Sequence, residues 1–540
     1  MRACKQWFVD TSKIKTTAME CIENDVSIMP KNSGHGMLAM LQRRSYWCIS
    51  RQRAWGVPIP VFYEKATGNC LLSRASAEHV FSVVRQKGTD AWWTMSVNEL
   101  LPPHVKEQSG FDKDAEFEKG TDILDIWFDS GCTWAHILGD EGVSDVYLEG
   151  LDQFGGWFQS SLLTSVAVRG YAPYRALVVH GFAVDEDGKK MSKSLGNVVD
   201  PQTVINGSKT EPAYGADVLR WWAARANLDT VVEIGPTVLE RCHEQIFRVR
   251  KNLRYLLANL FDFKPKQDQV PYQELPPQDR YTLHLLYKFI SAVTTSYEEY
   301  NYSRVANLVE KFINSDVSGF YCHITKDRLY CEVSSETPRR SAQTVQFLLL
   351  EALLKVIAPV VPHLAEEFFM YHPFTEIGDS IFKTQWCQAN SEWNNEDLQR
   401  TFNAAFQVRD AFNGAIPGEN PIEYDLKIYL QNEGLNYLSA LQPEESSTSS
   451  CLVEVFQSSA VSLLYEHDEP PPQVNTSESK LVQGFLSIIR KDASVVEEPF
   501  SLLIQPAARY ICERCRRYTA DTYAMPCDRC STVMTHGWDQ

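Results

Sequence analysis

The chain has 540 residues and a formal net charge of −17 at neutral pH, with 44% hydrophobic and 22% charged residues. Such a length and composition indicate a multidomain globular protein with about three or four domains. They exclude a generally basic nucleic-acid binder, a disulfide scaffold, since only 14 residues are cysteine, and a membrane-spanning chain, since no apolar run approaches about 20 residues. An acidic chain still binds RNA where cations gather locally.

Residues 1–230 alternate short apolar runs with helical stretches, which predicts an α/β domain. The run at 176–181 predicts a buried parallel strand that leads into a loop. Ligands of open α/β sheets bind beyond the carboxyl ends of the strands, so we expect His180 to lie where chemistry takes place. The stretch from about 60 to 120 is interpreted as a connective insertion, to which no chemistry is assigned.

A lysine-rich loop follows this strand. Residues 189–197 read KKMSKSLGN, and Asp187 and Gly188 open the loop. Lys190 and Lys193 place two ammonium groups three residues apart, and two serines add hydroxyl donors. Such a loop can close over a triphosphate and neutralise the charge that grows in a transition state. An ordinary solvated charge run is the alternative, which the full nine-residue string disfavours.

The middle of the chain is predicted to be helical. Residues 279–372 carry apolar side chains at a spacing of four, which is typical of a helix bundle. Prolines between 265 and 277 predict a linker before it. Residues 400–505 mix a helix with strand-like runs such as 425–430. Residues 216–262 also show a helical pattern, and their cations favour a solvated face and a phosphate-tracking stripe about equally: Arg241, Arg248, Arg250, Lys251 and Arg254.

Two C-x-x-C pairs near the end of the sequence predict a metal site. Cys512 and Cys515 are separated by eleven residues from Cys527 and Cys530. Four thiolates complete the tetrahedral shell of one Zn²⁺ and leave no open position, so we expect the site to be structural. Unligated cysteines are the alternative. Five arginines make this segment locally basic, which suits an RNA backbone: Arg509, Arg514, Arg516, Arg517 and Arg529.

Six segments together resemble the class I aminoacyl-tRNA synthetases. Residues 190–194, which read KMSKS, resemble the signature loop of that family, and residues 47–60 and 125–131 resemble blocks shared by its isoleucine, valine and leucine enzymes. Residues 147–161 resemble the isoleucine version, and residues 359–367 resemble a helix of the anticodon-binding domain. The terminal cysteine pairs resemble the zinc module of bacterial-type isoleucyl enzymes. The resemblance covers nearly the whole chain and is nearest to the isoleucyl enzymes of bacterial and mitochondrial type.

The resemblance also implies roles for individual residues. For catalysis, Lys193 is the first choice as the group that binds the ATP phosphates, and Lys190 is the second. The residues implied in ATP binding are Lys190, Met191, Ser192, Lys193, Ser194 and His180. Those implied in binding isoleucine and its adenylate are Glu149, Gly150, Asp152, Gln153, Trp157, His180 and Trp127. From the residues alone, Trp157 is more often a core residue than a ligand-binding one.

The implied architecture is a partial Rossmann-type α/β catalytic domain (1–230), an α-helical bundle that binds the anticodon (231–395), an α+β tRNA-binding region (396–508) and a zinc-binding module (509–535). The implied substrates and partners are Mg²⁺-bound ATP, L-isoleucine and tRNA(Ile), with one structural Zn²⁺, no membrane and a monomeric state. The implied location is the mitochondrial matrix, with the cytoplasm as the alternative.

Two features of the family have no counterpart among these residues. The second ATP signature, His-Ile-Gly-His, is missing, and so is the editing domain that interrupts the catalytic fold. We therefore expect a C-terminal portion of a longer enzyme, which lacks the N-terminal half of the catalytic domain and is inactive alone. The predicted function is that of an isoleucine–tRNA ligase. The alternatives are a non-catalytic tRNA-binding fragment and a valine or leucine enzyme of the same class.

Overall fold

The computed structural model describes residues 5–139, 141–228, 231–372, 379–442, 450–472 and 479–536. Contacts divide the chain into two compact units. The first comprises Met1–Asn197 and Asn227–Glu233, and the second comprises Val198–Ala226 and Ile234–Gln540. Within the described ranges, no helix is both long enough and apolar enough to cross a membrane.

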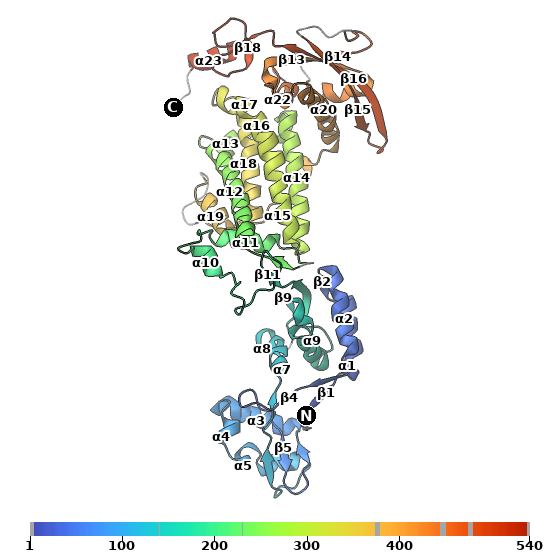
Figure 1. The fold of residues 1–540 in the computed structure, drawn as a ribbon, viewed down its shortest axis with the longest axis vertical. Helices are drawn as coiled ribbons and strands as arrows, with labels where there is room; N and C mark the ends of the chain where they lie inside the picture. The colour runs from blue at the N-terminus through green and yellow to red at the C-terminus, as the bar shows by residue number, and fades with distance from the viewer. Residues whose placement is uncertain are drawn as a thin grey trace. The chain divides into compact units, whose positions relative to one another are not determined.

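A three-stranded parallel sheet is the centre of the first unit (Figure 1). Its order is β2-β10-β9, so β10 lies between two partners and is buried along most of its length. The strand predicted at 176–181 is thereby confirmed as β10, and its apolar run is that of a central parallel strand. The elements of this part are β2 (Ser27–Met29), β9 (Ser144–Gly150), β10 (Tyr174–His180), α1 (Ser12–Asn24), α2 (Gly34–Arg43) and α9 (Trp157–Arg169).

Helix α9 connects β9 to β10 and carries the core of this unit. Phe158 and Leu162 are fully buried and pack with Leu177 of β10 and with apolar side chains of α1 and α2. A strand, a crossover helix and a parallel strand form the βαβ unit on which ligand-binding α/β sheets are built. The α/β class predicted for this region is confirmed.

Two of the family-like segments pack directly against each other. The indole N–H of Trp47 donates a 3.0 Å hydrogen bond to Asp125, and the guanidinium of Arg51 lies 3.0 Å from the same carboxylate. Asp125 is almost fully buried, so these two donors compensate its charge. The segments are joined by the antiparallel pair of β4 (Ser50–Arg51) and β8 (Ile123–Leu124). The neighbouring elements are β3 (Tyr46–Cys48), which precedes β4, and α7 (Ile126–Gly131) and α8 (Thr133–Leu138), which follow β8.

The insertion between these segments has a core of its own. Trp92 is fully buried, packs against Phe62 with ring centroids 5.1 Å apart and planes tilted by 57°, and donates its indole N–H to the Gly120 carbonyl. A separate core explains how a long insertion folds without disturbing the parallel sheet. Its elements are β5 (Phe62–Glu64), β6 (Cys70–Leu71), α3 (Arg74–Lys87), α4 (Ala91–Thr94), α5 (Val97–Leu100), α6 (Pro103–Gln108) and β7 (Phe117–Lys119).

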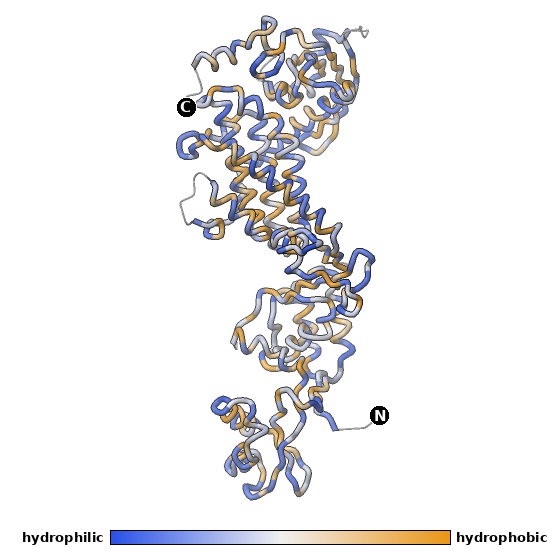
Figure 2. The backbone as a smooth tube through the Cα atoms, turned by 60° about the vertical axis from the view of Figure 1, so that its left-hand side comes forward, coloured by the Kyte–Doolittle hydropathy of each residue, from blue (hydrophilic) through white to orange (hydrophobic). Residues whose placement is uncertain are grey.

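The second unit begins with a helical bundle, in which apolar and polar positions alternate along the helices (Figure 2). The helix bundle predicted at 279–372 is confirmed, whereas the single helical stretch expected at 216–262 is interrupted between Ala226 and Gly235. The main helices are α10 (Pro201–Asn206), α11 (Ala216–Arg225), α12 (Pro236–Ala258), α14 (Pro277–Glu298), α15 (Tyr302–Lys311), α17 (Lys326–Cys331), α18 (Thr337–Ile357) and α19 (Pro362–Met370).

A buried ionic network ties the bundle to the region that follows it. Arg328 of α17 contacts both carboxylate oxygens of Asp279, at 2.7 and 2.9 Å, and lies 3.1 Å from Glu454. The hydroxyl of Tyr321 donates to the same aspartate at 3.0 Å. Breaking a buried pair of this kind leaves an uncompensated charge and typically costs about 3–5 kcal/mol. The network therefore fixes α17 against α14 and α22.

A four-stranded sheet, β14-β13-β16-β15, follows the bundle, and α20 packs on it. The strand expected at 425–430 is confirmed. The elements of this region are α20 (Glu396–Ala415), β13 (Tyr424–Leu430), α21 (Asn432–Ser439), α22 (Cys451–Phe456), β14 (Ala460–Tyr465), β15 (Lys480–Ile489) and β16 (Val495–Pro506); β17 (Tyr510–Ile511), β18 (Tyr518–Ala520) and α23 (Asp528–His536) complete the chain.

The π-helix η4 (Phe312–Tyr321) carries a carboxyl group that is costly to ionise. Burial raises the pKa of Asp316 from 3.8 to about 6, against a smaller opposing effect of Lys311. Because the folded-state pKa exceeds the unfolded one, this group's contribution to stability is greatest at acidic pH and is lost as the pH rises to about 6. Asp316→Asn should therefore stabilise the protein at pH 7.5, by roughly 1–3 kcal/mol, and have little effect near pH 4.

Thermal unfolding followed between pH 4 and pH 7.5 measures this difference. Asp145→Asn is the control, because that carboxylate is 80% exposed and pairs only with the exposed Arg175. A benefit of Asp316→Asn that stays constant across the pH range would contradict the assignment.

Candidate active site and metal centre

The parallel pairing of β9 with β10 aligns the carboxyl ends of two strands. In the register of the pair, Gly150 lies opposite His180, and Glu149 lies opposite Val179. Glu149 is exposed, and His180 is partly exposed with its Nδ1 atom 2.8 Å from the Gly181 carbonyl oxygen. Three of the residues predicted for isoleucine and adenylate are thus neighbours at the edge where α/β sheets bind ligands.

Gly150 lies close to the side chains of two other candidate residues. A Cβ atom on it would lie 2.7 Å from the Oδ1 atom of Asp152 and 3.6 Å from the imidazole of His180. Gly150 has an extended backbone (φ −70°, ψ 159°), and the chain passes from it into the short 3₁₀ helix η2 (Leu151–Phe154), which carries Asp152 and Gln153. Gly150, Asp152 and His180 therefore lie close together.

Gln153 terminates this turn and starts helix α9. Its Oε1 atom accepts a 3.0 Å hydrogen bond from the backbone N–H of Trp157, and its Nε2 atom donates to Asp152 at 3.0 Å. A first-turn N–H of a helix has no partner within the helix, so the glutamine acts as a cap. Gln153 thus precedes the helix that Trp157 begins and contacts it through this hydrogen bond.

Trp157 is held in one orientation by two contacts. Its ring stacks on that of Tyr147, with centroids 4.0 Å apart and planes 8° from parallel, and its indole N–H donates to the Ser130 carbonyl at 3.0 Å. Trp127 lies close by, because a Cβ atom on Gly156 would come within 2.8 Å of its ring. The two tryptophans differ in exposure, since Trp127 is 38% exposed and Trp157 is packed against the core.

The lysine loop is a hairpin held by polar side chains. β11 (Ala183–Val184) bridges back to Lys190, and Gly188 makes the turn with φ = 76°, a conformation that favours glycine. Asp185 accepts a 2.7 Å hydrogen bond from the amide of Asn197 and a 2.8 Å bond from the backbone N–H of Lys189. These bonds lower the pKa of Asp185 and keep it ionised.

The two catalytic candidates on this loop have different surroundings. The Lys190 ammonium lies 3.8 Å from the centroid of the Phe182 ring, a cation–π contact. The Lys193 side chain is exposed, as are Ser194 and Leu195. Ser192 and Ser194 form hydrogen bonds with other residues of the same loop. The structure brings Met191, Ser192, Lys193 and Ser194 together on the hairpin, at the end of the strand that carries His180.

Several residues that shape the site were not assigned from the sequence. Phe182, Asp185 and Asn197 hold the loop, and Tyr147 supports Trp157. An Asp two residues before Asp187-Gly188 is a recognisable turn signal. The sequence does not indicate that Tyr147 is the aromatic partner of Trp157. Tyr147 lies on β9 and Trp157 on α9, and only the folded packing brings the two rings together.

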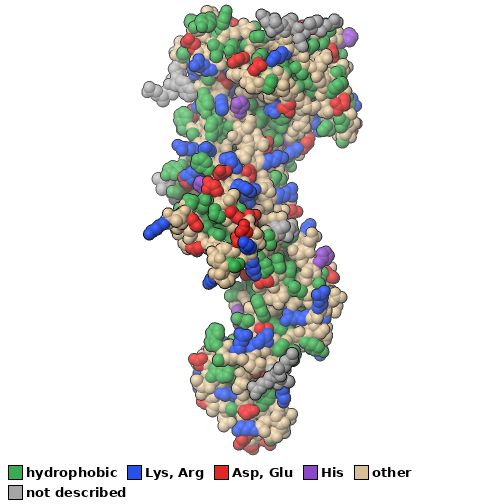
Figure 3. All heavy atoms as spheres, viewed as in Figure 1, with side chains coloured by type: hydrophobic (Ala, Val, Ile, Leu, Met, Phe, Trp, Pro, Cys, Tyr) green, Lys and Arg blue, Asp and Glu red, His purple; other side chains and the backbone are tan. Residues whose placement is uncertain are grey.

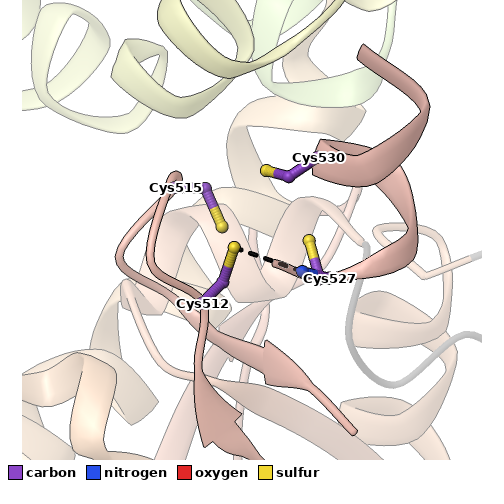
Figure 4. Close-up of side chains that lie close together, drawn as sticks. All are labelled: Cys512, Cys515, Cys527 and Cys530. Atoms are coloured by element: carbon purple, nitrogen blue, oxygen red, sulfur yellow. Dashed lines mark hydrogen bonds between the residues drawn. The ribbon is translucent and has the colours of Figure 1, made fainter. Parts of the chain in front are cut away.

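Four cysteine thiols converge at the end of the second unit (Figure 4). The ligand atoms of Cys512, Cys515, Cys527 and Cys530 all lie within 4.8 Å of one another, and two of the side chains are fully buried. A tetrahedral Zn–S₄ site separates its sulfurs by about 3.8 Å, so the four residues fit such an ion. The backbone N–H of Cys527 donates to the sulfur of Cys512 at 3.3 Å, a contact that stabilises a thiolate.

The basic surface expected around the cysteines is largely used inside the protein. Arg529 pairs with Asp327 and Glu332, Arg514 donates to the Cys331 carbonyl, and Arg517 donates to the Ser458 carbonyl. Two of the five arginines, Arg509 and Arg516, are left at exposed positions. In Figure 3, cations and anions are interspersed over the visible face. The prediction of a five-arginine RNA surface needs this correction, because three guanidinium groups serve internal contacts.

The arginine stripe of α12 is also partly paired. Arg248 contacts Glu310 at 3.3 Å, Arg250 pairs with Glu367, and the Lys251 ammonium lies over the Phe247 ring. Arg241 and Arg254 are exposed. Some cations of this helix therefore serve internal contacts and others face solvent, and the phosphate-tracking role stays a prediction.

The capping role of Gln153 predicts a stability effect. Gln153→Ala removes the acceptor for the Trp157 N–H and should lower the free energy of unfolding by about 0.5–2 kcal/mol. Gln86→Ala is the matched control, because Gln86 lies exposed near the end of α3 and should change stability by less than about 0.5 kcal/mol. Thermal unfolding of both variants checks this, and equal melting temperatures would contradict the cap.

Comparisons with known proteins identify two domains and several relatives. Residues 1–234 match a family model described as tRNA synthetases class I (I, L, M and V), and residues 279–418 match the anticodon-binding domain of tRNA ligase. The mitochondrial isoleucine–tRNA ligase of Gallus gallus is 46% identical over 99% of this chain and 54% of that protein. That of Mus musculus is 43% identical over 99% of the chain and 53% of the protein.

A bacterial isoleucine–tRNA ligase is also similar to this chain along nearly its whole length. The isoleucine–tRNA ligase of Prochlorococcus marinus (strain MIT 9211) is 37% identical over 99% of this chain and 54% of that protein. The chain spans about half the length of the curated relatives it matches. Two matched domain models, and relatives aligned along 99% of the chain, lead to one conclusion: residues 1–234 form a class I tRNA synthetase domain, residues 279–418 form an anticodon-binding domain, and the chain is a homologue of the isoleucine–tRNA ligases.

Proposed function

We propose that this chain serves the reaction of an isoleucine–tRNA ligase, in which ATP drives the attachment of isoleucine to tRNA(Ile) through an isoleucyl-adenylate. The observation that carries the proposal is the alignment of isoleucine–tRNA ligases along 99% of the chain, including both the strand-end residues and the lysine loop. The mitochondrial names of the Gallus gallus and Mus musculus relatives support a role in mitochondrial protein synthesis.

In this reaction the protein mainly positions the substrates and stabilises the charge that develops on the phosphates. The isoleucine carboxylate attacks the α-phosphate of Mg²⁺-bound ATP, pyrophosphate leaves, and the aminoacyl group then passes to a ribose hydroxyl of the tRNA. Neither step needs a covalent enzyme intermediate. Cations that meet the phosphates as negative charge shifts toward pyrophosphate lower the barrier most, since this charge is largest in the transition state.

Lys193 and Lys190 supply these cations in the proposal. Lys193 is exposed on the hairpin, so its ammonium is available for phosphate oxygens. Lys190 lies over the ring of Phe182, and this contact orients its side chain. Among the residues that the structure describes, no carboxylate forms an ion pair with Lys190, so its charge is available for phosphate. Met191, Ser192 and Ser194 complete the ATP loop, and Asp185 and Asn197 fix its base.

The strand-end cluster provides the amino-acid site in the proposal. Glu149 and Asp152 offer carboxylates for the substrate ammonium, and Gly150 leaves room for its backbone beside His180. Trp157 and Trp127 offer apolar walls for a branched side chain, and Gln153 orients the turn between them. A branched aliphatic side chain and a charged ammonium need this combination of apolar and acidic groups.

The domain assignment follows the same proposal. Residues 1–230 act in catalysis, 231–395 bind the anticodon arm, 396–508 extend the tRNA surface, and 509–535 hold one structural Zn²⁺. The matched anticodon-binding model and the four converging thiols support the tRNA and zinc roles respectively. The closed set of four thiols leaves no position for substrate, so the metal supplies folding energy to the module. We propose that the chain acts as a monomer.

A second candidate is a tRNA-binding protein without adenylate chemistry. It is favoured by one observation, the absence of a His-Ile-Gly-His string from the 540 residues. A valine or leucine specificity has less support, because the relatives compared here carry the isoleucine name.

The absent histidine string predicts that the chain by itself gives no isoleucine-dependent ATP–pyrophosphate exchange. A chimera in which the N-terminal residues of the Gallus gallus relative precede this chain should give exchange with isoleucine and much less with valine or leucine. Exchange by the chain alone, clearly above that of its Lys193→Ala variant, would overturn the first expectation. A folded chimera that binds tRNA but activates no amino acid would favour the second candidate.

In the same chimera, Lys193→Ala should lower the exchange rate about 100- to 1,000-fold, a loss of roughly 2.7–4 kcal/mol of transition-state stabilisation, while the KM for isoleucine changes little. Lys189→Ala is the matched control, since the neighbouring ammonium is paired with Asp187 at 3.2 Å and should matter by less than about threefold. Equal effects of the two substitutions, or a KM that rises as steeply as the rate falls, would remove Lys193 from its role.

A further inference from the structure

The cysteine module touches the helical bundle through an arginine that lies between two of its thiols. Arg529 follows Cys527 and precedes Cys530 on the first turn of α23. Its guanidinium contacts both carboxylate oxygens of Asp327, at 2.6 and 2.8 Å, and lies 2.7 Å from Glu332. Asp327 is the second residue of helix α17, and Glu332 follows its last residue. The Arg529 side chain therefore contacts residues at both ends of helix α17.

A second arginine connects a cysteine sulfur to the same helix. Arg514 donates a 2.6 Å hydrogen bond to the carbonyl of Cys331, the last residue of α17, and lies 3.5 Å from the sulfur of Cys530. A cation at the carboxyl end of a helix meets carbonyl groups that have no partner within the helix. The position of Arg514 thus depends on the cysteine cluster on one side and on α17 on the other.

Helix α17 is also held by the helices that surround it. Arg328, the residue after Asp327, is buried and bound to Asp279 of α14 and Glu454 of α22. The helix has only six residues, so it presents the module with a short element that neighbouring helices fix in place. Contacts to it connect the module to the bundle core.

We propose that the cysteine module is a metal-dependent clamp on the helical bundle, and that Arg529 is the positioning residue through which metal binding fixes the module on α17. The proposal rests on the zinc assignment made above. Metal bound by Cys527 and Cys530 closes the turn that carries Arg529 and so sets the direction of its guanidinium. Release of the metal would make that turn mobile, and the guanidinium of Arg529 would then lose the orientation in which it binds both Asp327 and Glu332.

The burial of the three groups makes the clamp effective. The side chains of Arg529, Asp327 and Glu332 are 33%, 19% and 15% exposed, so solvent screens their attraction less than it screens a surface pair. A cavity of about 310 Å³ lies beside the contact and is lined by charges of both signs, among them Arg328 and Asp528. Such a mixed lining selects no single class of ligand, which favours a structural role for the contact.

Hydrogen exchange measured by mass spectrometry on the whole chain tests the clamp from both sides. In the zinc-loaded protein, Arg529→Ala should raise the exchange of residues 326–332 about tenfold while one equivalent of zinc stays bound, as measured by elemental analysis. Removal of zinc from the unaltered chain by a chelator should raise exchange in the same residues by a similar factor. Arg529→Lys should have an intermediate effect, because an ammonium cannot engage both carboxylates in a fork.

Asp327→Asn supplies the reciprocal measurement, because it alters the bundle and leaves the metal-binding segment unchanged. It should raise exchange in residues 509–535 with zinc retained. Arg516→Ala is the matched control, since that exposed arginine of the same module should leave both regions unchanged. Exchange at 326–332 that is unaffected by Arg529→Ala and by zinc removal would overturn the clamp. A chain that binds no zinc would overturn both the zinc assignment and the metal dependence.

Discussion

The candidate active site depends on one interaction, the parallel pairing of β9 with β10. This register puts Gly150 beside His180 and sends the two strands into different functional segments. From β9 the chain turns through η2 into α9, which carries Trp157. From β10 it enters the lysine hairpin. Because both segments begin at the same edge, groups suited to an amino acid and groups suited to a triphosphate emerge close to one another without any long-range signal in the sequence.

The parts of this arrangement that the sequence predicted are those with a local cause. A central parallel strand needs an apolar run, and 176–181 shows one. The cap formed by Gln153, the stacking of Trp157 on Tyr147 and the tie between Asp185 and Asn197 were not predicted. These contacts depend on how side chains meet across turns and between elements, which spacing alone does not determine.

The arginines of the cysteine module illustrate the same limit. Their clustering in the sequence favours RNA binding, yet Arg514, Arg517 and Arg529 each meet an internal acceptor. Local positive charge in an acidic protein has two physical uses, since it can meet phosphate or it can meet the protein's own carboxylates and carbonyls. Only the fold shows that Asp327 and Glu332 lie opposite Arg529. The cysteine pairs, by contrast, have so specific a spacing that their convergence followed from the sequence.

The central claim is that these residues serve an isoleucine-specific tRNA synthetase. The most direct measurement is the binding of the chain itself to purified tRNAs, by filter retention at fixed ionic strength, because affinity for RNA depends strongly on salt. The account predicts that tRNA(Ile) binds at least about tenfold more tightly than tRNA(Leu) or tRNA(Val), a difference of about 1.4 kcal/mol or more. Equal affinity for all three tRNAs, or no binding by the folded chain, would contradict it.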